Sequence, residues 1–229
     1  MTDNEARWGM TPVARSAAPV KERVVAALRE AILEFKVTPG ERLVEREIMQ
    51  GMDVSRATVR EALSVLASEG LVTVVPQKGA HVAIPSADDA ADLYEVRAAL
   101  ESLVVRRFIE RATDDEVALL QGTVGLMQRE LDDDTGINSF LRAKDEFYAV
   151  LDTGARSASL SQLLASIQAR VRMLRLTSLS TPDRLPHVVT EMREIVDAIA
   201  HRNIDRASRL MTEHIQMAST LALSALHRA

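Results

Sequence analysis

The first third of the chain combines a helical hydrophobic pattern with an alternating one. Apolar side chains recur every three or four positions in three successive segments, which predicts amphipathic helices. The three segments are residues 24–35, 43–52 and 55–68. Residues 71–75 and 80–84 are rich in Val, Ala and Ile and flank a turn, so they predict a β-hairpin. Three helices followed by a hairpin predict a winged helix-turn-helix domain, which we place at residues 18–84.

From residue 88 onward the pattern is helical throughout, and residues 88–229 predict an all-α bundle of about six helices. Breaks rich in Asp, Gly, Ser, Thr and Pro separate the helices. The expected helices are 88–111, 114–132, 137–152, 158–177, 184–202 and 205–227. Residues 1–17 show no period and are expected to be a disordered tail. The fold class is therefore mainly α, with a small β-hairpin in the N-terminal domain.

The third predicted helix carries two arginines on the face opposite its apolar stripe. Arg56 and Arg60 lie four positions apart, and Ser55 is a good N-cap for the helix. Guanidinium groups near a helix N-terminus suit phosphates and guanine edges in a DNA major groove. An alternative is a solvated surface face. Arg46, in the second helix, is a further DNA contact or, alternatively, a partner in a surface ion pair.

The turn of the hairpin is the other predicted DNA contact. Gln77, Lys78 and Gly79 form its tip, where a glycine permits close backbone approach and a lysine offers a phosphate contact. Taken alone, this tip is an ordinary hairpin turn. Beside a DNA-reading helix, DNA contact is the favoured interpretation.

The N-terminal domain resembles that of GntR-family transcriptional regulators. The matching segments are residues 39–43 (PGERL), 45–47 (ERE), 54–56 (VSR), 59–63 (VREAL) and 69–72 (EGLV). The resemblance implies that Ala57 and Thr58 also face DNA. Ala57 stands where a threonine is common, which removes one hydroxyl contact. It further implies a homodimeric regulator, most often a repressor, that reads an inverted repeat in double-stranded DNA.

The helical domain resembles, more loosely, the FCD effector-binding domain of FadR-type members, through residues 93–101 (LYEVRAALE) and Phe147 with Leu151. Many FCD domains hold a divalent metal on one Asp and three His. Alignment on Phe147 places these four positions at Lys144, Tyr148, Met192 and His214. A lysine is cationic and a methionine is a poor ligand for hard ions, so we expect no metal and no other cofactor.

The same positions predict a pocket for a small organic acid. Lys144 and His214 lie on apolar stripes, and a buried lysine requires a counter-charge. Lys144 would bind a carboxylate, with Arg97 as a second cation, Tyr148 and His214 as hydrogen-bonding groups and Met192 as apolar wall. The alternatives are that Lys144 reaches the rim of the bundle, that His214 is a hydrogen-bonded core residue, and that Arg97 pairs with a glutamate four positions on.

Composition narrows the class of protein further. The 229 residues include no cysteine, no run of about 18 apolar residues and no secretory signal, so a cytoplasmic protein without a membrane span is expected. Residues 18–84 carry nine basic and nine acidic side chains, so any positive potential for DNA must be local. None of the five histidines lies in a nucleophile motif, so no enzyme is expected. Two rival readings are a metal-dependent member with a misaligned site and an effector-free dimerisation bundle.

Overall fold

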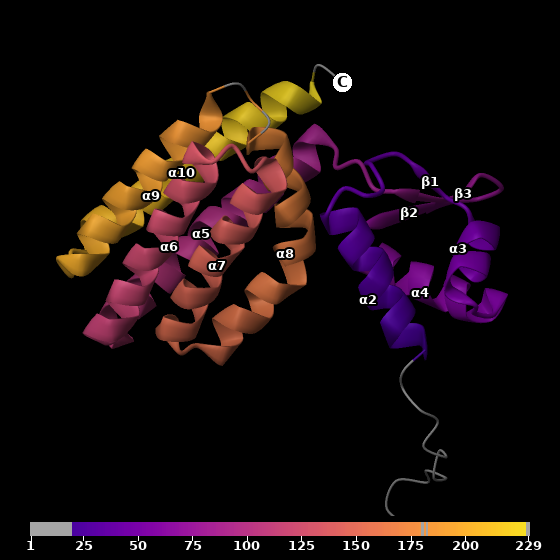
Figure 1. Cartoon of the computed structure of the whole chain (residues 1–229), viewed down its shortest axis with the longest axis horizontal. Coiled ribbons are helices and arrows are strands. Elements are labelled where there is room, and N and C mark those ends of the chain that lie inside the picture. Colours follow the sequence, from indigo (N-terminus) through magenta and orange to yellow (C-terminus); the bar gives the residue numbers. More distant parts are fainter. Residues whose placement is uncertain (1–19, 180, 182, 228–229) are drawn as a thin grey trace, which may run out of the picture.

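The computed structural model describes residues 20–227 except residues 180 and 182. The predicted tail at residues 1–17 lies outside this range. Two domains stand side by side, a small winged helix and a larger helical bundle (Figure 1). The predicted class, mainly α with a winged helix-turn-helix, is confirmed. No helix within the described ranges combines the length and the apolar character that a bilayer span needs.

The winged helix is built from three helices and a three-stranded antiparallel sheet. Its elements are α2 (Val20–Leu33), β1 (Arg42–Leu43), α3 (Glu45–Met52), α4 (Arg56–Ser68), β2 (Val72–Val75) and β3 (Gly79–Val82). The strand order is β1-β3-β2. The side chain of Ser55 caps α4 as predicted, because its hydroxyl oxygen accepts a hydrogen bond from the amide of Thr58 at 3.2 Å.

One boundary in this domain differs from the sequence-based expectation. The second helix begins at Glu45, because Arg42 and Leu43 pair with His81 and Ala80 as a third strand. Leu43 is buried as part of the sheet, although its apolar side chain suggested a helix from the sequence. Helix α3 is thereby placed close to the strands of the wing.

The second domain has the six expected helices. They are α5 (Ala87–Arg111), α6 (Asp114–Asp132), α7 (Ile137–Ala155), α8 (Ala158–Leu179), α9 (Arg184–Ala200) and α10 (Ile204–Leu226). Thr113 and Glu116 form a capping box at the start of α6, which satisfies amides that have no partner within the helix.

The expected end of the third bundle helix at residue 152 is wrong, because α7 continues to Ala155. Gly154 does not end the helix but lets α5 and α7 approach closely. A Cβ at this position would lie 2.5 Å from Cδ2 of Phe108, whose ring is fully buried. The glycine is therefore explained by packing rather than by a turn.

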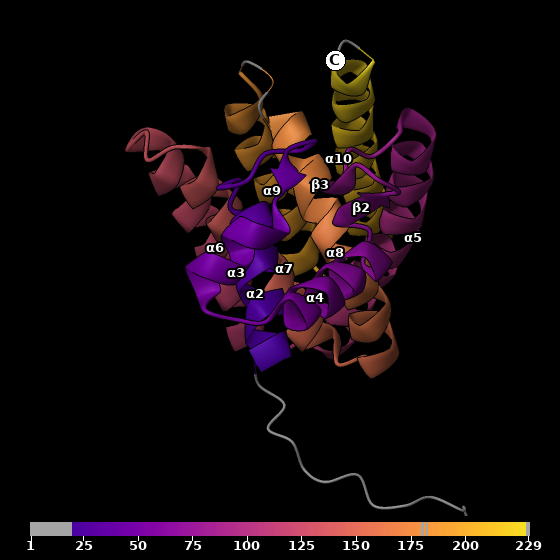
Figure 2. The same ribbon diagram turned by 90° about the vertical axis from the view of Figure 1, so that its right-hand side faces the viewer.

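Helix α8 is the part of the bundle that lies against the winged helix (Figure 1, Figure 2). Met173 of α8 is buried in the hydrophobic cluster of the N-terminal domain. Gly70, which follows the C-terminus of α4 with a φ of 72°, lies so close to α8 that a Cβ would come within 2.8 Å of Cδ of Arg170. The middle of α8 therefore meets the winged helix at α2 and at Gly70, directly after the end of α4.

Candidate functional site

The residues predicted to contact DNA form one open face of the winged helix. Five of them line a groove of about 880 Å³ between α3, α4 and the wing. These are Arg46, Arg56, Arg60, Gln77 and Gly79. Ser55, Ala57 and Thr58 lie at the start of α4, and Lys78 is exposed at the tip of the wing, so these four are not among the lining residues.

The arginines of α4 are paired with one carboxylate of α3. Nε of Arg56 donates to Oε2 of Glu45 at 2.8 Å, and Nε of Arg60 lies 3.3 Å from Oε1 of the same residue. Both arginine side chains remain about 70% exposed. The hydrogen bond from Arg56 is the main cause that keeps the pKa of Glu45 below its ordinary value. Sequence spacing gave no sign of this pairing, which joins two helices across a turn.

In the helical domain, the predicted ligand residues lie in a buried polar network. Nζ of Lys144, which is only 2% exposed, lies 3.0 Å from Nε2 of His214. On its other side, the His214 ring is hydrogen-bonded through Nδ1 to Glu191, which in turn receives two hydrogen bonds from Arg184. Lys144 therefore does not reach the rim of the bundle, whereas His214 is a hydrogen-bonded core residue, which is one of the two interpretations that the sequence allows.

Burial is the main cause of the pKa shifts in this part of the network. It lowers the pKa of Lys144 well below its ordinary value, and nearby Arg97 and Arg175 add to the effect. It also lowers the pKa of His214. Burial alone would raise the pKa of Glu191, but the hydrogen bonds from His214 and Arg184 outweigh it and bring that pKa to about 2.

A second cluster surrounds Arg97. Its Nε donates to Glu101 at 2.7 Å, so Arg97 forms the ion pair with the glutamate four positions further along the helix. Its Nη2 donates to the Tyr148 hydroxyl at 2.8 Å. Arg175 of α8 lies over the Tyr148 ring, 3.9 Å from its centroid, and donates to Asp145 at 3.1 Å. Burial and the charge of Glu101 raise the pKa of the Tyr148 hydroxyl to about 12, so it is a hydrogen-bond donor at neutral pH.

Within the described residues, the arginines of this network outnumber the carboxylates that pair with them. Four arginines, Arg97, Arg172, Arg175 and Arg184, pair with three carboxylates among the described residues, and Lys144 lies beside His214. The three carboxylates are Glu101, Asp145 and Glu191. Several guanidinium nitrogens are buried without a hydrogen-bond partner among the described residues, including Nη1 of Arg97 and Nε of Arg175. Buried donors of this kind normally have a partner, so the arrangement favours an additional acceptor.

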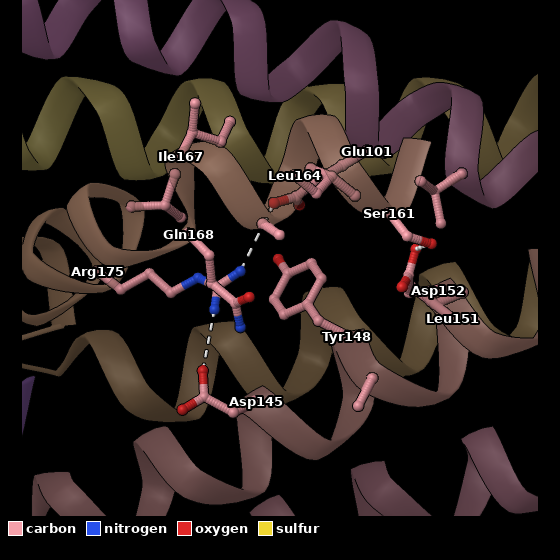
Figure 3. Close-up of a pocket in the computed structure, with 14 residues that line it drawn as sticks. Glu101, Asp145, Tyr148, Leu151, Asp152, Ser161, Leu164, Ile167, Gln168 and Arg175 are labelled. Carbon is pink, nitrogen blue, oxygen red and sulfur yellow. Dashed lines mark hydrogen bonds and ion pairs between the residues drawn. The ribbon is translucent and has the colours of Figure 1, made fainter. Parts of the chain in front are cut away.

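A cavity of about 340 Å³ opens beside this network, between α5, α7 and α8 (Figure 3). Its polar lining residues include Glu101, Asp145, Tyr148 and Arg175, and Asp152 accepts a hydrogen bond from Ser161 at 2.8 Å. The apolar lining comes mainly from Val104, Leu151, Leu164, Ile167 and Val171. Figure 3 shows the Arg175 guanidinium lying against the Tyr148 ring at one end of the cavity.

Of the five predicted ligand residues, only Tyr148 lines this cavity. Arg97 lies behind it, in contact with both Glu101 and Tyr148, whereas Met192 is fully buried on α9. Sequence analysis missed Arg175, because the repeat of α8 alone does not show which side of that helix faces the bundle.

The residues at the four aligned metal positions do not suit a divalent ion. His214 has both ring nitrogens engaged, one by the Lys144 amine, and Tyr148 holds its proton. No group of three or more His, Cys, Asp or Glu side chains in the described part of the chain has a geometry that could hold a metal. The absence of a metal therefore stays a prediction, which a direct metal analysis would test.

A winged helix with exposed arginines on its recognition helix, joined to a helical bundle, defines the class of two-domain DNA-binding regulators. Residues 20–82 match the bacterial regulatory proteins of the gntR family, and residues 92–217 match the FCD domain. The chain therefore belongs to the GntR family and has an FCD domain. It is a DNA-binding transcription regulator and not an enzyme, as predicted.

Individual relatives agree with this assignment. The chain is 32% identical to the Nta operon transcriptional regulator of Aminobacter aminovorans, over 80% of this chain and 85% of the relative. It is 30% identical to the HTH-type transcriptional repressor RspR of Escherichia coli, over 86% of each. A GntR regulator structure from Rhodococcus superimposes with a TM-score of 0.77 at 28% identity, covering 89% of this chain and 97% of that one.

Proposed function

We propose that the protein is a cytoplasmic, homodimeric, ligand-responsive transcription repressor whose effector is a small organic acid. The observation that carries the proposal is the cavity between α5, α7 and α8, which adjoins a network whose arginines outnumber the carboxylates that pair with them among the described residues. A cavity of about 340 Å³ is in the range of small-molecule sites. As a dimer, two winged helices would read the two halves of an inverted repeat.

The chemistry of the pocket supports an anionic ligand. A carboxylate beside Arg175 would accept a hydrogen bond from its guanidinium, whose Nε has no hydrogen-bond partner among the described residues. It would also supply an acceptor beside buried guanidinium nitrogens that have no hydrogen-bond partner among the described residues. The apolar wall of Leu164 and its neighbours would hold the rest of the molecule.

Helix α8 offers a route from this pocket to DNA. Ile167, Val171 and Arg175 line the cavity, whereas Arg170 and Met173 contact the winged helix. A ligand that prefers one position of α8 would change the placement of the DNA-binding domains. The shift in DNA affinity cannot exceed the difference in ligand affinity between the two states.

A ligand screen tests the effector proposal. We would measure thermal unfolding of the full chain with a panel of small organic acids and with their neutral amide analogues, and repeat it with Arg175→Gln. We expect some acids, but not their amides, to raise the melting temperature of the wild type, with a much smaller rise in the variant. Hits confined to neutral or cationic compounds would refute an acid effector.

Native mass spectrometry with metal analysis on gently purified protein separates the remaining alternatives. A dimer that carries a small anionic mass and no metal would support the proposal. A stoichiometric divalent ion would show a metal-dependent member with ligands other than those aligned. A dimer that no compound in the panel stabilises would favour a bundle that serves only for dimerisation.

A further inference from the structure

The arginines of α4 share one carboxylate, and that residue belongs to another helix. Glu45 is the first residue of α3, and its side chain is 28% exposed. Its two oxygens are divided between the two arginines, Oε2 at 2.8 Å from Nε of Arg56 and Oε1 at 3.3 Å from Nε of Arg60. Glu45 therefore links the first two turns of α4 to the start of α3.

The atoms used in these contacts leave the recognition atoms of the arginines available. In both pairs the arginine contributes Nε, and the terminal nitrogens of Arg56 and Arg60 make no hydrogen bond with any described residue. Those terminal nitrogens form the fork that binds O6 and N7 of a guanine or two phosphate oxygens. Anchoring at Nε restricts the rotation of a long exposed side chain before DNA arrives, which reduces the entropy lost on binding.

A direct role in reading bases fits Glu45 less well. A glutamate can accept a hydrogen bond from N4 of cytosine. Here, however, each carboxylate oxygen already faces a guanidinium. The carboxylate would also repel phosphates if it were not matched by these two cations.

We propose that Glu45 is a positioning residue for DNA recognition, which holds the guanidinium groups of Arg56 and Arg60 with their terminal nitrogens directed at the groove. The proposal does not depend on an effector in the helical domain. It goes beyond the sequence-based expectation, in which the two arginines act alone and Glu45 has no role.

The test compares Glu45→Gln with Glu47→Gln in the full-length protein. Each substitution removes one negative charge from the first turn of α3, but Glu47 is exposed and has no ion pair with any described residue. The probes are a duplex selected by the wild-type protein from a random library and a duplex of equal length and composition with a scrambled sequence. Fluorescence anisotropy at one salt concentration gives both dissociation constants, and their ratio measures specificity.

We expect Glu45→Gln to lower the specificity ratio by about tenfold or more, because guanidinium groups that are no longer held in position lose their hydrogen bonds to guanine. Binding to the scrambled duplex should stay equal or become tighter, since one repulsive charge is gone. Glu47→Gln should tighten binding to both duplexes alike and keep the ratio. A Glu45→Asp variant, which keeps the charge but is one methylene shorter, should lose specificity as well.

Three outcomes would overturn the proposal. The first is an unchanged specificity ratio in both Glu45 variants. The second concerns a protein that already carries Arg56→Ala and Arg60→Ala. If Glu45→Gln lowered the specificity ratio there by the same factor as in the wild type, Glu45 would act through helix packing and not through the arginines. The third is a change in the preferred base at one position with full affinity retained, which would mean that Glu45 reads that base itself.

Discussion

The contact between α4 and α8 makes a quantitative prediction for Gly70→Ala. Gly70 has a φ of 72°, and an L-residue in this conformation costs about 1–2 kcal/mol. The added Cβ would also lie 2.8 Å from Cδ of Arg170, and overpacking of this kind costs about 1 kcal/mol or more. We therefore expect the winged helix to lose about 2–3 kcal/mol of unfolding free energy, the sum of these two effects.

The two contributions separate in a double-mutant cycle. In an Arg170→Ala background the contact is absent, so Gly70→Ala should cost about 1 kcal/mol less than in the wild type. Gly79→Ala serves as the matched control, because its φ is 92° but its Cβ would be at least 3.6 Å from any neighbour, and this cost should not depend on Arg170.

Native-state hydrogen exchange of amides in α4 would give the free energies for the winged helix alone. If Gly70→Ala and Gly79→Ala responded identically to Arg170→Ala, α8 would not contact the end of α4 as described, and the route from pocket to DNA would be lost.

Three further predictions test other parts of the structure. Arg56→Ala and Arg60→Ala should each weaken binding to a selected duplex by about tenfold or more while thermal unfolding is unchanged, and full affinity in both would contradict the assignment of α4 as the DNA-reading helix. Gly154→Ala should destabilise the bundle by about 1–3 kcal/mol, because its Cβ would meet the buried ring of Phe108, and calorimetry showing no change would contradict the close approach of α5 and α7. Because burial lowers the pKa of His214, the unfolded chain takes up a proton there first as the pH falls below about 6.5. The melting temperature should therefore fall from pH 7 to pH 5, less so in His214→Gln; an equal fall in both proteins would assign the pH dependence to other groups.

The winged helix was predictable from sequence because its signals are local. The cap at Ser55, the apolar stripe with Val59 and the glycine after α4 each act within a few residues of their own position. Strand β1 was missed, because two residues carry no period, and Leu43 joins the sheet only through a partner nearly forty residues away.

The pocket was predictable only in part, because its geometry depends on partners from several helices. An apolar stripe correctly indicated that Lys144 and His214 are buried. It could not show that the two side chains contact each other, nor that Arg175 of α8 would lie over Tyr148. Gly154 is a second example. A glycine is expected both where two helices approach closely and where a helix ends, so the sequence alone does not distinguish the two cases.

The buried arginines of the bundle and the exposed arginines of α4 share one feature, a guanidinium group held by a carboxylate. A guanidinium held by a carboxylate keeps donors for a further partner, and what that partner can be depends on exposure. At the groove, Arg56 stays open to solvent and its free donors suit the polyanionic backbone and guanine edges of DNA. Beside the cavity, Arg97 and Arg175 are almost fully buried, so a free donor there is costly unless a small acceptor enters. Because α8 carries Arg175 on one side and Met173 on the other, an acceptor bound at the pocket would act on the same helix that supports the DNA-binding domain.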